Sequence, residues 1–197
     1  MKRVTKWLLA AALGVAAFPA AAELQFGRMD TGLYLGGSIG GSEYRNACDG
    51  APALGVGCDE KDFAWRGFAG WQFNRYIGLE LGYAQLGKAE ASGGGASASL
   101  KSRGADLVGV FTYPFNDMFG VYGKAGVARM RTKINSTIGN VTENSTDFTF
   151  GGGLRFNFAR NVSARLEWQR YHDVGDENTT GKTKIDYWSV GLLYGFY

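Results

Sequence analysis

Seven charged side chains stand at alternating positions of β-type runs, on faces opposite to apolar side chains. Charges that share a buried face must pair or stay hydrated, because an unpaired ion in a low-dielectric interior is costly. A closed network of charge-assisted hydrogen bonds can hold strands in one register, so we favour a structural role over a gate. The seven are Arg66, Glu80, Asp106, Lys124, Arg155, Arg165 and Glu167, four positive and three negative.

Other reactive patterns are weak. His172, the only histidine, lies near Asp173 and Asp176, but no serine within a few residues and no neighbouring glutamate completes a charge relay. The glycine-rich stretches 36–41 and 151–153 lack the following helix or the Lys-Ser/Thr pair of a phosphate cradle. We therefore predict no catalytic residue, no metal site and no cofactor. Four acids can attract divalent cations but fit a solvated surface better: Asp49, Asp59, Glu60 and Asp62.

The two cysteines, Cys48 and Cys58, lie ten positions apart in a polar segment. Their spacing is not that of a C-x-x-C redox or zinc motif, and the histidine is far away in sequence. In an exported protein such a pair predicts a disulfide, which would stabilise by about 3 kcal/mol in the chain-entropy model.

Eight runs of alternating apolar and polar residues must position the charges. In the clearest run Phe148, Phe150 and Leu154 share one face, while Thr149 and Arg155 lie on the other. The predicted strands are 32–44, 63–73, 76–87, 104–113, 120–131, 147–158, 162–172 and 187–196.

The runs fit a membrane better than a soluble sandwich or a lipocalin. Aromatic residues cluster at the ends of the runs, as in interfacial girdles, and runs of about ten residues suit a ~25 Å apolar band. Short connections alternate with long polar ones around 45–62, 88–103, 132–146 and 173–186. The pattern predicts an all-β fold, an eight-stranded antiparallel up-and-down transmembrane β-barrel.

Residues 1–22 have the basic start, apolar run and small-residue end of a secretory signal peptide. We then expect a lead-in over 23–31 and the barrel over 32–197. The formal net charge is +3, but the leader contributes three lysines and arginines and no acid, which leaves 3 − 3 = 0 for the rest. A general nucleic-acid binder is therefore unexpected.

The sequence resembles the transmembrane domain of outer-membrane protein A and its eight-stranded relatives. The resemblance covers most of the mature chain and rests on four pieces in order: 67–83 with 86–87, Tyr113-Pro114, 164–169 and 189–196. It implies a monomeric barrel in a Gram-negative outer membrane, and a chain that ends without the peptidoglycan-binding domain of longer relatives. Phe196, near the end of the last run, resembles the family's C-terminal assembly signal.

The resemblance also assigns roles to some inward charges. Glu80 and Arg165 match the acid-base pair that blocks the interior of the type member, so we expect them to interact directly or through one water. The positions of the type member's switching lysine and second glutamate are occupied here by Val110 and Arg155. This difference puts in doubt a gate that works by exchange of ion-pair partners, although Lys124 or Arg155 can compete for Glu80.

These expectations define the functional hypotheses. The main one is a non-enzymatic envelope protein that displays four surface loops, with adhesion or host contact through them. Its expected partners are outer-membrane lipids, lipopolysaccharide and the barrel-assembly machinery. The alternative is a narrow porin-like channel for ions or small solutes, and an enzyme that modifies lipid A is a weaker third hypothesis.

Overall fold

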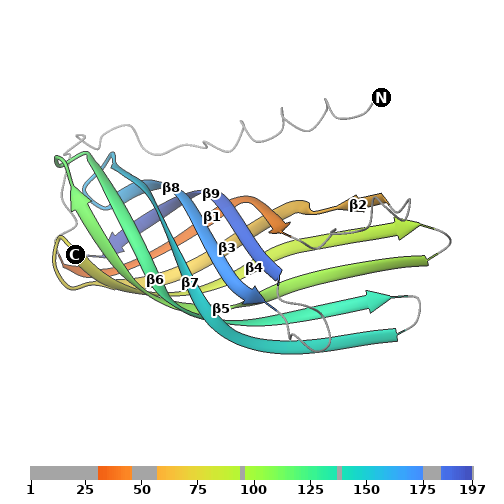
Figure 1. The fold of residues 1–197 in the computed structure, drawn as a ribbon. Coiled ribbons are helices and arrows are strands. Elements are labelled where there is room, and N and C mark those ends of the chain that lie inside the picture. Colours follow the sequence, from red (N-terminus) through yellow and green to blue (C-terminus); the bar gives the residue numbers. More distant parts are fainter. Residues whose placement is uncertain (1–30, 46–56, 94–95, 137–138, 175–182, 197) are drawn as a thin grey trace, which may run out of the picture.

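The regular elements of the protein are all strands in the computed structural model, which describes residues 31–45, 57–93, 96–136, 139–174 and 183–196 (Figure 1). The strands are β1 (Gly32–Arg45), β2 (Gly57–Asp59), β3 (Lys61–Gln72), β4 (Ile77–Gly93), β5 (Ala96–Pro114), β6 (Phe119–Ser136), β7 (Gly139–Asn157), β8 (Val162–Val174) and β9 (Thr183–Phe196).

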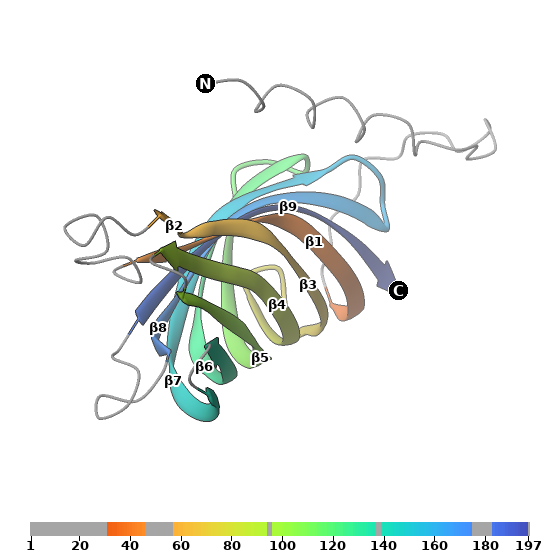
Figure 2. The ribbon, with the colours of Figure 1, turned by 90° about the vertical axis from the view of Figure 1, so that its right-hand side faces the viewer.

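The strands close into a ring. Their order is β2-β4-β3-β1-β9-β8-β7-β6-β5, every neighbouring pair is antiparallel, and β4 also pairs with β5 to join the ends of this order. β2 only adds three residues beside β4. Figure 2 shows the strands arranged around a common interior. The predicted closed eight-stranded antiparallel barrel is confirmed.

The barrel is apolar outside and polar inside. Phe148 and Leu154 are 54% and 56% exposed, whereas Arg155, next in sequence to Leu154, is buried. Large exposed hydrophobic side chains recur on all eight ring strands, and a continuous apolar exterior of this kind requires lipid around it. Successive side chains along each strand therefore face the lipid and the barrel interior in turn, as the sequence predicted.

In two of the short turns an asparagine side chain accepts hydrogen bonds from two backbone amides. After β3, the Asn74 side-chain oxygen accepts hydrogen bonds from the amides of Tyr76 (2.8 Å) and Ile77 (3.0 Å). After β5, Asn116 accepts from Met118 (2.9 Å) and Phe119 (2.7 Å) in the same way. Side-chain capping of this kind stabilises a tight reversal of the chain and fixes the register of both hairpins.

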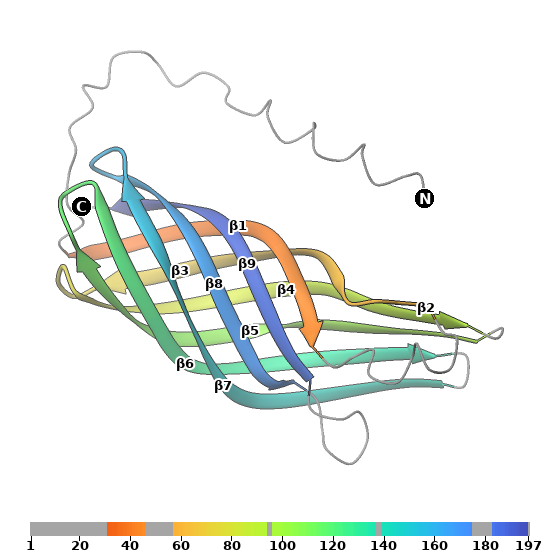
Figure 3. The same cartoon turned by 45° about the horizontal axis from the view of Figure 1, so that its top comes forward.

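The opposite end departs from the sequence prediction. The segments 88–103 and 132–146 were expected to be polar loops, but strands β4 to β7 continue through them, and only 94–95 and 137–138 separate their assigned ends. We call the part of β4–β7 formed by these segments the extension; Figure 3 shows it projecting past β1 and β9. Its sequence is rich in serine, threonine and asparagine, because a sheet beyond the lipid needs no apolar face.

Some sequence predictions concern residues that lie outside the described ranges. They are the signal peptide over 1–22, the lead-in up to residue 30, Cys48, Asp49 and Asp176. The disulfide between Cys48 and Cys58 therefore stays a prediction. Over the ranges that the structure describes, no helix is long and apolar enough to cross a membrane.

The outward face of β4 offers a direct test of the polarity. Leu81 is 59% exposed in the apolar band, and Leu81→Arg should lower the free energy of unfolding in lipid vesicles by about 2–4 kcal/mol. Gln85 lies on the same face of the same strand, four residues nearer the extension, so Gln85→Arg should change stability by less than about 1 kcal/mol. Equal effects in urea titrations would contradict the placement of the band.

Candidate functional site

The interior of the barrel carries the candidate site. All seven charges predicted to face inward do so, and none is more than 5% exposed. They come from β3 to β8, because each stands on the inward parity of its strand. The structure divides them into two ion-paired groups and one arginine nearer the short turns.

Glu80 on β4 is the centre of the first group. One carboxylate oxygen accepts from Nη1 of Arg66 at 2.7 Å, and the other accepts from Nη1 of Arg165 at 2.7 Å. The Tyr34 hydroxyl donates to the second oxygen at 3.2 Å. The expected contact between Glu80 and Arg165 is thus a direct one, and a single carboxylate links strands β1, β3, β4 and β8.

Arg66 extends this group to β5. Its Nε donates to Asp106 at 3.0 Å and its Nη2 donates to the other Asp106 oxygen at 2.5 Å, which is a bidentate pair. The Tyr171 hydroxyl donates to Asp106 at 3.2 Å. Arg66 therefore uses its fixed fork of donors to hold two carboxylates from neighbouring strands.

Lys124 and Glu167 form the second group. The lysine Nζ donates to Glu167 Oε1 at 2.6 Å, and the Tyr122 hydroxyl donates to Oε2 at 2.7 Å. Arg155 donates to the Asn157 side chain at 3.1 Å. Of the two cations considered as competitors for Glu80, Lys124 is held by its own carboxylate, that of Glu167.

A glycine leaves space for one buried arginine, and aromatic rings contact another. A Cβ at Gly82 would collide with the Arg66 guanidinium, so a side chain at this position would push the guanidinium away from its carboxylate partners. The Arg165 guanidinium carbon lies 4.9 Å from the Tyr122 ring centroid and 5.5 Å from that of Tyr34. At these distances the rings offer cation–π attraction to a buried charge.

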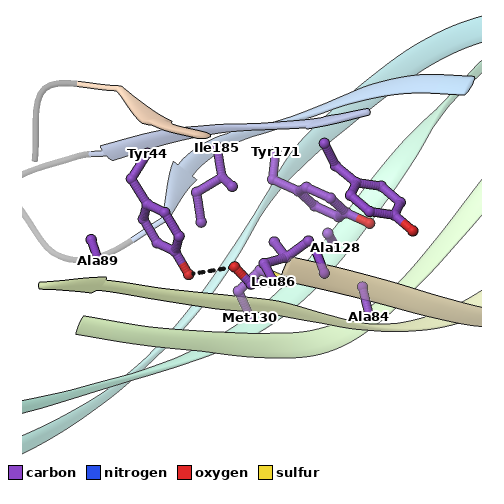
Figure 4. Close-up of a cluster of buried hydrophobic side chains, with 10 residues drawn as sticks. Tyr44, Ala84, Leu86, Ala89, Ala128, Met130, Tyr171 and Ile185 are labelled. Carbon is purple, nitrogen blue, oxygen red and sulfur yellow. Dashed lines mark hydrogen bonds between the residues drawn. The ribbon is translucent and has the colours of Figure 1, made fainter. Parts of the chain in front are cut away.

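An apolar cluster fills the interior on the side of the extension (Figure 4). Leu86, Met130 and Ile185 pack there with the rings of Tyr44 and Tyr171. The Tyr44 hydroxyl donates to the backbone carbonyl of Leu86 at 3.0 Å, which satisfies the buried phenol. Tyr171 joins the two layers, because its ring belongs to this cluster while its hydroxyl reaches Asp106.

These layers leave water no access to the main ion pair. The side chains of Arg66 and Glu80 are both 0% exposed. A buried pair of this kind is stable only if its desolvation is offset by good geometry and further hydrogen bonds, which Asp106, Arg165 and Tyr34 supply. The arrangement can fix strand register, because it ties side chains from several strands to one another.

Sequence reasoning missed the tyrosines that face the interior and a further ion-paired cluster around Asp186. Tyr122 shares the inward parity of Lys124, so alternation alone could have placed it inside. Asp186 on β9 is also buried and accepts from Arg45 (2.6 Å) and Arg170 (2.6 Å), which stand on strands at either side. Its sequence position beside Tyr187 and Trp188 gave no sign of a buried acid.

Two other predicted residues lie on or near the outer surface. Phe196 is the last residue of β9 and is 49% exposed, and its role as an assembly signal stays a prediction. His172 is only partly exposed and stacks on Phe150, with ring centroids 5.4 Å apart. This contact uses the imidazole as an aromatic surface.

Comparisons with known proteins agree with this architecture. Residues 28–197 match the family model of the OmpA-like transmembrane domain. Outer membrane protein A of Salmonella typhi is 31% identical over 198 residues, covering 97% of this chain and 55% of that protein. The chain thus spans about half the length of the curated relatives that it matches.

Solved structures show the same fold at low identity. The crystal structure of Neisserial surface protein A has a TM-score of 0.62 at 16% identity, covering 83% of this chain and 97% of that one. Ail of Yersinia pestis, crystallised with the heparin analogue sucrose octasulfate, has a TM-score of 0.53 at 19% identity, covering 84% and 99%.

Removing the central carboxylate of Glu80 should destabilise the barrel strongly. Glu80→Gln leaves Arg66 and Arg165 without their shared counter-charge, and we expect a loss of about 3–5 kcal/mol in the free energy of unfolding. Asp186→Asn is the matched control, because the side chains of its partners Arg45 and Arg170 are 54% and 23% exposed and stay in contact with water, so the loss should be about 1 kcal/mol. Urea titrations in lipid vesicles with equal losses would contradict a central role for Glu80.

Proposed function

Because the chain belongs to the OmpA-like transmembrane domain family of Gram-negative outer-membrane β-barrels, we propose that it is a structural, non-conducting and non-enzymatic envelope protein. Its barrel anchors the extension and the other long connections at the cell surface, with the asparagine-capped turns toward the periplasm. The observation that carries this proposal is the sealed ion pair of Arg66 and Glu80 at the centre of the barrel.

A narrow channel was the alternative hypothesis, and the filled interior weighs against it. An ion entering the barrel would have to displace Arg66 from both Glu80 and Asp106 as well as pass the apolar cluster. Eight strands enclose an interior that side chains can just fill, which is the geometry of a plug.

Lipid A modification is the third hypothesis. His172 lies against Phe150, and the sequence has no serine within a few residues of it. We propose that the barrel carries no catalytic residues, and that its contacts with outer-membrane lipids, lipopolysaccharide and the assembly machinery are those of a monomeric membrane protein.

Adhesion through the displayed surface is the finer part of the proposal. The extension continues β4 to β7 beyond the apolar band as paired strands, so it can offer a pre-formed surface to an extracellular ligand. The Ail structure with sucrose octasulfate gives a precedent in a barrel of similar fold, and makes sulfated sugars a probe worth testing here.

Conductance tests the sealed barrel. In planar bilayers the purified protein should give no defined openings above baseline, because Arg66 and Glu80 close the interior. Insertion is verified independently by the shift in gel mobility between unboiled and boiled samples, and a general porin serves as the positive control. Reproducible unitary openings from inserted protein would overturn the proposal and favour the channel.

Truncation of the extension tests display. Replacing 88–101 and 132–143 with short glycine-containing turns should preserve the ring pairings of the barrel and hence the heat-modifiable gel mobility. Adhesion of bacteria expressing this variant to host cells should fall to the level of bacteria without the protein. Undiminished adhesion with the variant present at the cell surface would contradict a role for the extension.

A further inference from the structure

Five basic side chains form one patch on the outside of β5 and β6, which we call the basic wall. All five are exposed and share the outward parity of their strands. They are Lys101 and Arg103 on β5, and Arg129, Arg131 and Lys133 on β6.

The strand register brings like charges face to face in this wall. Lys101 stands directly opposite Lys133, and Arg103 stands directly opposite Arg131. Like charges at paired positions destabilise a sheet, so an anion that bound between two successive pairs would relieve their repulsion. Within the part of the chain that the structure describes, no carboxylate forms an ion pair with these five side chains.

Another part of the same rim shows that the fold can supply such a partner. Arg45 and Arg170 share the buried carboxylate of Asp186 between them. The basic wall therefore differs from this part of the rim in having no acid partner among the described residues, so an anion from outside the described chain can supply its counter-charge.

The position of the wall indicates where that counter-charge lies. Arg103 is on the same outward face as the exposed, apolar Leu107, four residues further along β5. Four residues correspond to about 14 Å along a strand and roughly 10 Å along the axis of a tilted barrel. The cations thus face sideways, just beyond the lipid-facing band, at the depth of lipid headgroups.

The shape of the wall suits an anionic group. A groove of about 310 Å³ lies among four of the cations, and Gln85 lines it from β4. On β7, Asn144 and Thr146 pair with Arg131 and Arg129, and both expose polar side chains on the same outer surface. Arginine binds phosphate oxygens through two parallel N–H groups, and amide or hydroxyl groups can complete the coordination.

We propose that the basic wall binds the phosphate groups of an outer-leaflet glycolipid with the chemistry of lipid A. The inference rests on the proposed function, because it requires the extension to face outward from the outer membrane. Lipid is favoured over a soluble sulfated glycan because the cations continue the lipid-facing surface and point away from the barrel axis.

The test uses the full chain folded into phosphatidylcholine vesicles that contain either diphosphorylated or dephosphorylated lipid A. Fluorescently labelled lipid A reports binding by energy transfer from tryptophan. The variant Arg103→Gln/Arg131→Gln should bind diphosphorylated lipid A at least about tenfold more weakly, the loss expected for two charge-assisted hydrogen bonds. Dephosphorylated lipid A should bind wild-type protein and variant equally weakly.

The matched control is Lys61→Gln/Lys184→Gln, which removes two exposed, outward cations from β3 and β9. It should change binding less than twofold. Equal losses in both variants would show a general charge effect and overturn the site, as would an unchanged Arg103→Gln/Arg131→Gln variant. Tighter binding of sucrose octasulfate than of diphosphorylated lipid A at the wall would also overturn it, in favour of a sulfated glycan.

The outcome separates this inference from the proposed function. Heat-modifiable gel mobility verifies that each protein has entered the vesicles as a folded barrel. A wild-type chain that does not insert would overturn the outer-membrane role itself. Insertion without any dependence on lipid phosphate would overturn only the basic wall.

Discussion

The structure depends on one constraint: in lipid, each backbone amide and carbonyl must find its partner within the protein. The pairing of β4 with β5 meets this requirement by joining the two ends of the sheet order, so the ring keeps no free edge inside the apolar band. Closure then fixes the side-chain directions, because alternate residues on each strand face lipid or face a narrow interior. The buried ions are a consequence of that geometry.

The interior offsets the desolvation cost of these ions by separating polar and apolar side chains into layers. Carboxylates and guanidinium groups occupy the middle, where Glu80 and Asp106 share Arg66, and tyrosine hydroxyls complete their hydrogen bonds. Aliphatic and aromatic groups occupy the layer toward the extension. Tyrosine suits the boundary because it has a hydrophobic ring and a single polar atom at its tip.

Sequence alternation predicted the ring and the inward placement of all seven charges, since a period of two determines which face a residue occupies. It could not pair Arg66 with Asp106, because partner choice across β3, β4 and β5 depends on strand stagger and side-chain reach. It was wrong about 88–103 and 132–146, where small and polar side chains weaken the apolar signal although backbone pairing continues. Asp186 was missed because the last strand was predicted to begin at residue 187, whereas β9 begins at Thr183.

The seam between β1 and β9 has a consequence for the order of assembly. Leu33 pairs with Phe196, so this contact joins positions separated by almost the whole described chain, whereas the hairpins around Asn74 and Asn116 form between close sequence neighbours. Closing so long a loop has a larger entropic cost and is slow. The ring therefore cannot close before β9 is in place, and until then the sheet has two unpaired edges that are open to pairing with other chains.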